Sequence, residues 1–197
     1  MTRTRTAILI SGRGSNMMAL VEAAKEKSFP AEIVCVVANR PEAPGLKFAA
    51  DNGIATKVID HKLFASREAF DTALHDYLLS RRIELIACAG FMRIMTADLI
   101  AKWQGRMLNI HPSLLPAYKG LHTHERALAD GATTHGCTVH FVSAELDSGE
   151  IILQAEVPVL NGDTPETLAA RVLKEEHRVY PQALALIARK FQAKTST

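Results

Sequence analysis

The sequence has few cysteines, three among 197 residues, and no two of them form a Cys-x-x-Cys pair. This spacing supports neither a disulfide framework nor the common thiolate zinc sites. We expect Cys35, Cys88 and Cys137 to be buried thiols of a protein in a reducing compartment.

Strong charge of one sign is also missing. The formal net charge is +2 and no basic run exceeds two residues, so nucleic acid or an acidic membrane is not an expected partner. The apolar run that follows the first six residues is too short for a signal peptide or a membrane span. We therefore expect a cytoplasmic protein that binds small molecules.

The residues that are present, 48% hydrophobic and 22% charged, fit one compact domain over residues 1–197. Apolar runs typical of strands alternate with helical patterns. The strand-like runs are 7–10, 33–38, 55–59, 85–89 and 107–110, and the helical ones are 17–27, 46–51, 66–80 and 96–103. This alternation predicts an α/β fold with a doubly wound, mostly parallel, Rossmann-like sheet and helices on both faces.

The alternation of strands and helices ends near the carboxyl end of the chain. Residues 137–142 and 151–160 alternate like strands with no helix between them, which predicts an antiparallel hairpin at the sheet edge. A last helix is expected to begin at 163–166, and Pro181 should kink it or split it in two.

Three polar or glycine-rich loops follow predicted strands: Gly12–Asn16, Gly90–Met95 and Asn109–Ser113. Ligands of open α/β sheets bind beyond the carboxyl ends of the strands, so these loops predict a crevice. The glycines and helix-start amides of the first loop favour a phosphate. It is neither a dinucleotide fingerprint nor a Walker loop. Alternatively, Ser15 and Asn16 simply cap the helix.

Asn109 and His111 are two residues apart in a strand, so their side chains leave the same face. An amide donor beside an imidazole suits a reaction in which negative charge develops on a carbonyl oxygen. The alternative is a polar strand end with His111 bonded for structure. Asp147 allows two interpretations. It is an ordinary turn residue beside Gly149, or its carboxylate folds back over the crevice and keeps His111 protonated.

Other polar residues allow two interpretations. Glu176 lies on the inward stripe of the last helix, where it should meet an arginine or ligand hydroxyls. Arg67 and Arg93 are surface charges or anion contacts. Four histidines are possible zinc ligands, but no cysteine or acidic cluster completes the set of ligands, so we expect no metal site. These histidines are His122, His124, His135 and His140.

Several motifs occur together in a fixed order. They are 10-ISGRGSN-16, 89-AGFMRI-94, 109-NIHPSLLP-116, 120-GLHTH-124 and 147-DSG-149. Together they resemble the phosphoribosylglycinamide formyltransferase family, folate-dependent enzymes of purine synthesis. The resemblance runs from Ile8 to about Pro181. The family often has a second glycine where Ser148 stands, a change that we expect to be tolerated.

The resemblance implies formyl transfer from 10-formyltetrahydrofolate to the amine of glycinamide ribonucleotide, without a metal, by a monomer or weak homodimer. It implies that residues of about 1–100 bind the phosphate and those of about 101–197 carry catalysis and the folate. The implied catalytic residues are Asn109, His111 and Asp147. The implied ribonucleotide contacts are Gly14, Ser15, Asn16 and Glu176. The implied folate contacts are Arg67, Met92, Arg93, Ile94, Met95, Asn109, Ser143, Ala144, Glu145, Leu146 and Asp147.

This chemistry needs no covalent nucleophile. Asn109 and protonated His111 would donate to the tetrahedral oxyanion, and His111 would then protonate the departing folate nitrogen while an Asp147-bound water takes the amine proton. Rival functions are formyltetrahydrofolate hydrolase, formylation of initiator methionyl-tRNA, and a non-catalytic sugar-phosphate module. The first two normally carry an extra domain, and the third leaves the implied catalytic residues unused.

Overall fold

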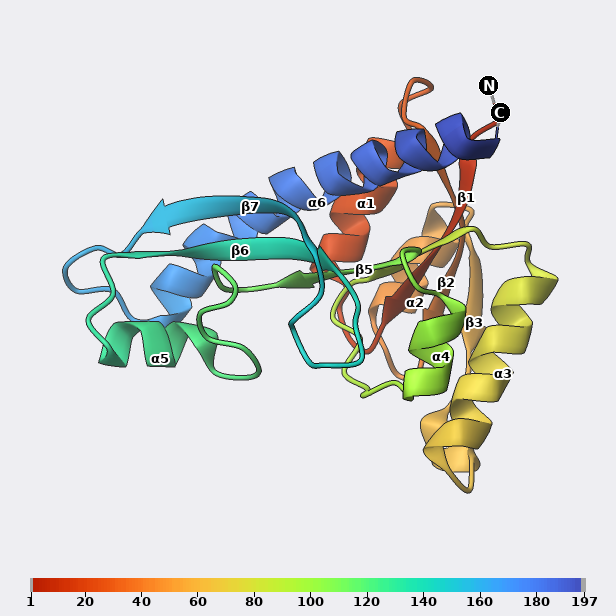
Figure 1. Cartoon of the computed structure of the whole chain (residues 1–197), viewed down its shortest axis with the longest axis horizontal. Helices are drawn as coiled ribbons and strands as arrows, with labels where there is room; N and C mark the ends of the chain where they lie inside the picture. The colour runs from red at the N-terminus through yellow and green to blue at the C-terminus, as the bar shows by residue number, and fades with distance from the viewer. Residues whose placement is uncertain (1, 196–197) are drawn as a thin grey trace.

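The computed structural model describes residues 2–195, with side chains up to residue 193. Within these residues one seven-stranded sheet has the order β3-β2-β1-β4-β5-β6-β7 (Figure 1). The strands are β1 (Thr4–Ile10), β2 (Ala31–Ala38), β3 (Ala55–Val58), β4 (Leu85–Cys88), β5 (Met107–His111), β6 (Thr134–Phe141) and β7 (Ile151–Pro158). Pairs from β3 to β5 are parallel, whereas β5–β6 and β6–β7 are antiparallel. The predicted mostly parallel sheet with an antiparallel edge hairpin is confirmed.

Helices cover both faces of the sheet, as expected. They are α1 (Ser15–Ala24), α2 (Gly45–Asp51), α3 (Arg67–Ser80), α4 (Ala97–Lys102), α5 (Thr123–Ala129) and α6 (Pro165–Thr195). Alternate residues of β1 point to opposite faces of the sheet and pack in two separate cores. Ile8 and Ile10 belong to the core that includes residues of α1 and α6. Ala7 and Leu9 belong to the core that includes residues of α3 and α4. Figure 1 shows α1 alongside α6 on the first face.

Pro181 was expected to kink the last helix or split it in two, and the prediction of a split is wrong. Helix α6 is continuous from Pro165 to Thr195 with Pro181 inside it. An interior proline costs about 3 kcal/mol because it removes a hydrogen bond and crowds the preceding turn. Neighbouring side chains offset this cost: Tyr180 and Leu184 are fully buried, and the Tyr180 hydroxyl donates to the Cys88 carbonyl at 2.8 Å.

Two short elements have no counterpart in the predicted pattern, the 3-10 helix His61–Leu63 and α5. Helix α5 is held by tertiary bonds, because Thr123 donates to the Pro112 carbonyl and Arg126 to that of Lys119. Such bonds leave no periodic apolar signature in the sequence.

All three cysteines are buried and free, as predicted. No helix within residues 2–195 combines the length and apolar character needed to span a membrane.

Candidate active site

The strand order reverses between β1 and β4, which places a switch point at their carboxyl ends. The chain leaves β1 through the Gly12–Asn16 loop and β4 through the Gly90–Met95 loop. The backbone N–H of Ser11 donates to the Gly90 carbonyl at 3.1 Å, so the two loops begin side by side. The adjacent strand β5 ends at His111.

His111 is buried and lies between two oxygen acceptors. Its Nδ1 atom is 3.4 Å from Oδ2 of Asp147, and its Nε2 atom is 2.9 Å from the Tyr118 carbonyl oxygen. A ring that carries protons on both nitrogens satisfies both acceptors at once. The structure therefore brings the predicted acid and imidazole together.

Asp147 reaches His111 from the loop between β6 and β7. Its backbone adopts a positive φ of 50°, and its Oδ2 atom also accepts the Gly120 N–H at 2.9 Å. Two residues later, a Cβ on Gly149 would lie 1.8 Å from the Phe141 carbonyl oxygen, so this position requires glycine. The two interpretations of Asp147 therefore both hold: it is a turn residue, and its carboxylate folds back to His111.

His140 joins this group, although the sequence suggested it only as a zinc ligand. It lies opposite Asn109 in the antiparallel β5–β6 register, with its Nε2 atom 3.5 Å from Nδ2 of Asn109 and 3.8 Å from Oδ1 of Asp147. Burial lowers the pKa of His140, and its Nδ1 atom is 2.9 Å from the Phe141 carbonyl oxygen. The ring is therefore neutral at pH 7 with Nδ1 as donor, which leaves Nε2 to accept from Asn109.

The Gly12–Asn16 loop leads into α1, whose N-cap is Gly14 with a φ of 67°. No side chain caps this helix, so the capping alternative for Ser15 and Asn16 is wrong. Instead, Nδ2 of Asn16 donates to Oε2 of Glu176 at 2.7 Å. Burial raises the pKa of Glu176, and the bond from Asn16 partly opposes this. The partner of Glu176 is thus an amide from the glycine loop.

The residues implied for folate binding lie in two loops, at one helix start and, for Asn109, in β5. Met92, Ile94 and Leu146 expose more than half of their apolar side chains. The Arg93 guanidinium lies over the Phe70 ring at 5.4 Å from its centroid. Five further members are exposed or half-buried: Arg67, Met95, Ser143, Ala144 and Glu145. Asn109 is half-buried and Asp147 is buried.

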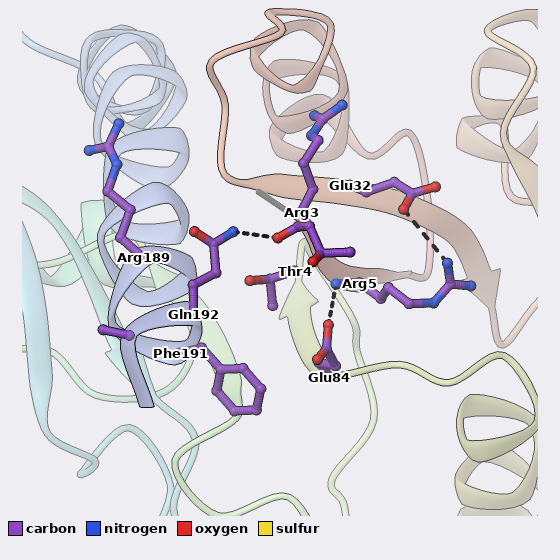
Figure 2. A pocket seen from close by; sticks show the side chains of 10 residues that line it. Arg3, Thr4, Arg5, Glu32, Glu84, Arg189, Phe191 and Gln192 are labelled. Carbon is purple, nitrogen blue, oxygen red and sulfur yellow. Dashed lines mark hydrogen bonds and ion pairs between the residues drawn. The ribbon is translucent and has the colours of Figure 1, made fainter. Parts of the chain in front are cut away.

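Two cavities lie outside the His111 and Asp147 pair. A cavity of about 400 Å³ separates Ala97 and Ile100 of α4 from Val142, Ser143 and Ala144. A larger one of about 770 Å³ lies at the amino ends of the strands, on the opposite edge of the sheet (Figure 2). Its polar groups bind one another: the Arg5 backbone N–H donates to Glu84 and the Arg5 guanidinium pairs with Glu32. The smaller cavity shares Ser143 and Ala144 with the implied folate contacts.

The remaining histidines do not form a metal centre. His124 Nδ1 lies 3.2 Å from His135 Nε2, and burial lowers the pKa of His135 to about 4. Across residues 2–195, no group of three or more histidine, cysteine or acidic side chains has a geometry that would hold a metal ion.

Comparisons with known proteins identify the class. The family model described as formyl transferase matches residues 4–184. The crystal structure of phosphoribosylglycinamide formyltransferase from Brucella melitensis superposes with a TM-score of 0.92 at 54% identity, covering 95% of this chain and 96% of that one. By fold and sequence the chain belongs to the formyl transferase family.

Curated relatives indicate to which family of formyl transferases the chain belongs. Phosphoribosylglycinamide formyltransferase of Escherichia coli (strain K12) is 44% identical over 181 residues, which is 92% of this chain and 85% of that protein. The chain belongs to the phosphoribosylglycinamide formyltransferase family. The trifunctional purine biosynthetic protein adenosine-3 of Bos taurus is 50% identical over 186 residues, and the chain spans only 18% of its length.

Proposed function

We propose that this chain transfers the formyl group of 10-formyltetrahydrofolate to the amine of glycinamide ribonucleotide in purine biosynthesis. The observation that carries the proposal is the 3.4 Å approach of Asp147 to His111, beside Asn109 on the same strand. In a member of this family, these side chains supply the donors and the charge that the reaction needs. The names of the bacterial relatives support the choice of acceptor.

The reaction is direct attack of a neutral amine on the formyl carbon. The Asn109 amide donates to the oxygen that becomes negative, the kind of preorganised stabilisation that is worth most in a water-excluded site. The His111 ring donates to the same oxygen once one of its N–H groups leaves its present acceptor, Asp147 or the Tyr118 carbonyl. His111 then protonates the folate nitrogen as it leaves. Asp147 stabilises the charged ring and holds the water that removes the amine proton.

Binding is divided between two regions. Gly14, Ser15 and Asn16 hold the phosphate at the start of α1, where backbone N–H groups and the helix dipole favour an anion. Glu176, fixed by Asn16, accepts hydrogen bonds from the ribose hydroxyls.

The folate lies against the exposed apolar side chains of the 92–95 and 143–147 loops, next to the cavity of about 400 Å³. Arg67 and Arg93 contact its acidic end.

A formyl-transfer assay with and without the ribonucleotide tests this function. We expect folate release only when the ribonucleotide is present, with one formylated ribonucleotide formed per folate. Folate release at the same rate without ribonucleotide would identify a hydrolase. Ribonucleotide binding without turnover would instead favour a sugar-phosphate module.

A further inference from the structure

Ser11 is the last residue before the glycine loop, and its hydroxyl makes one buried and one partly buried hydrogen bond. Oγ donates to Oδ1 of Asn39 at 2.6 Å and accepts the backbone N–H of Met92 at 2.8 Å. A serine hydroxyl has one proton to donate, and Asn39 takes it, so the lone pairs remain for Met92. Ser11 thus joins the segments that follow β1, β2 and β4.

The bond to Met92 extends the pairing of β1 with β4 beyond the ends of the strands. The Ala89 N–H donates to the Leu9 carbonyl at 2.9 Å, and the Ser11 N–H donates to that of Gly90 at 3.1 Å. The next bond in this series ends on a side chain, because the Met92 N–H donates to the Ser11 hydroxyl. The hydroxyl therefore fixes the path of the 92–95 loop where regular pairing has stopped.

This loop is anchored at its other end as well. The Thr96 N–H donates to Oδ2 of the buried Asp71 at 2.7 Å. Between the two anchors, Met92 and Ile94 are 62% and 66% exposed, so packing alone does not hold these side chains. Their position depends on the hydrogen bonds of the backbone at either end.

The acceptor of the Ser11 proton is rigid too. Asn39 is 1% exposed, and its backbone oxygen lies 2.8 Å from Nδ1 of His61 in the segment after β3. Because Asn39 fixes the direction of the Ser11 proton, the lone pairs of Ser11 point to Met92. Without the hydroxyl, the partly buried Met92 N–H would lose its acceptor, and the loop would shift to find another.

We propose that Ser11 is a positioning residue for the formyl-donor site: through the Met92 N–H it holds the 92–95 loop in the conformation that binds the donor. This inference rests on the proposed function and assigns a role to a residue that contacts neither substrate. The bonds of its side chain run to Met92 and Asn39 rather than to the 12–16 loop, so its effect falls on the donor more than on the ribonucleotide.

The test compares Ser11→Ala with Thr6→Val. Thr6 is fully buried at the other end of β1, and its hydroxyl bonds only to the backbone of Thr4, at 3.2 Å. Each variant removes one buried hydroxyl, that of Thr6 within β1 and that of Ser11 directly after it, so a purely structural effect should be similar in both. The readouts are steady-state kinetics and hydrogen exchange of the peptide over residues 90–96.

For Ser11→Ala we expect the KM for the formyl donor to rise about five- to tenfold, as for the loss of one hydrogen bond. The kcat and the ribonucleotide KM should stay within about twofold of wild type. Exchange over residues 90–96 should be faster than in wild type. Thr6→Val should leave both readouts unchanged. Ser11→Cys keeps the shape but accepts weakly, and should reproduce the donor effect if the alanine variant does not fold.

An unchanged donor KM in a folded Ser11 variant would overturn the proposal, as would an equal rise in Thr6→Val. Failure of the proposed function is recognised separately, because wild-type protein would then transfer no formyl group. In that case the exchange comparison and calorimetric titration with an unreactive folate analogue still decide whether Ser11 positions the loop.

Discussion

The Nε2 atom of His140 lies 3.5 Å from the Nδ2 atom of Asn109, directly across the antiparallel pair of β5 and β6. Because the other ring nitrogen of His140 faces the Phe141 carbonyl, the neutral ring accepts from Asn109 and fixes which way its amide points. The second N–H of that amide is left for the formyl oxygen in the proposed reaction.

His140→Leu should therefore lower kcat about tenfold and change both KM values little, because the donor remains but loses its orientation, and a misplaced donor stabilises a transition state poorly. His140→Gln keeps an acceptor on the side chain and should recover part of the loss. Steady-state kinetics of the two variants provide the measurement. Equal activity of His140→Leu and wild type would refute the orienting role.

Asp147→Asn should lower kcat about a hundredfold, because the amide neither stabilises a positive His111 nor binds the proton-accepting water as a carboxylate does. Its oxygen can still accept the Gly120 N–H, so the loop should keep its shape. Asp51→Asn is the control, since Asp51 pairs with Lys47 on the surface. A variant with normal kcat would remove Asp147 from the mechanism.

Gly45→Ala should raise the KM for the ribonucleotide about tenfold, with little change in the KM for the folate, because small displacements of positioning groups are costly to binding and rate. A Cβ at this position would lie 2.9 Å from the Arg13 carbonyl oxygen and 2.7 Å from Cδ1 of Ile10, which would displace the glycine loop from beneath. Ala50→Ser, on the exposed side of the same helix, should have no effect on either KM. A normal ribonucleotide KM in Gly45→Ala would show that the loop tolerates this displacement.

Acid should destabilise the fold through its buried histidines. Burial lowers the pKa of His135 to about 4, and it lowers that of His124 and His140 as well. The unfolded chain binds protons on these rings at higher pH than the folded chain does, so the free energy of unfolding is highest above about pH 6.5 and falls as the pH approaches about 4.

Urea unfolding at about pH 7 and about pH 5 measures this dependence. In the variant His135→Gln, the free energy of unfolding should differ between the two pH values by about 1–2 kcal/mol less than it does in wild type. The exposed His122, replaced by Gln, serves as the control. Identical pH dependence in His135→Gln and wild type would exclude His135 as the source.

The centre of the sheet could be predicted from the sequence because strands there are continuous apolar runs buried on both faces, such as 85-LIAC-88. The same reasoning located the Asn109 and His111 pair, since residues two apart in a strand share a face. Asp147 was suggested by the hairpin, whose turn brings its loop back beside β5.

His140 and Ser11 could not be assigned roles from local pattern. The role of His140 depends on the register of two strands about thirty residues apart, and that of Ser11 on a bond to a backbone N–H eighty-one residues away. Helix α6 shows the same limit, because packing of Tyr180 and Leu184 outweighs the local signal of Pro181. Contacts distant in sequence, rather than periodicity, decide these features.

The kcat of Asn109→Ala tests the central claim, that this amide stabilises the oxyanion of formyl transfer. The account predicts a loss of about a hundred- to a thousandfold, about 3–4 kcal/mol, with normal folding. Asn52→Ala, which removes an amide that bonds to the Phe48 carbonyl at the end of α2, should keep the wild-type kcat. A folded Asn109→Ala variant with a kcat near that of wild type would contradict the account.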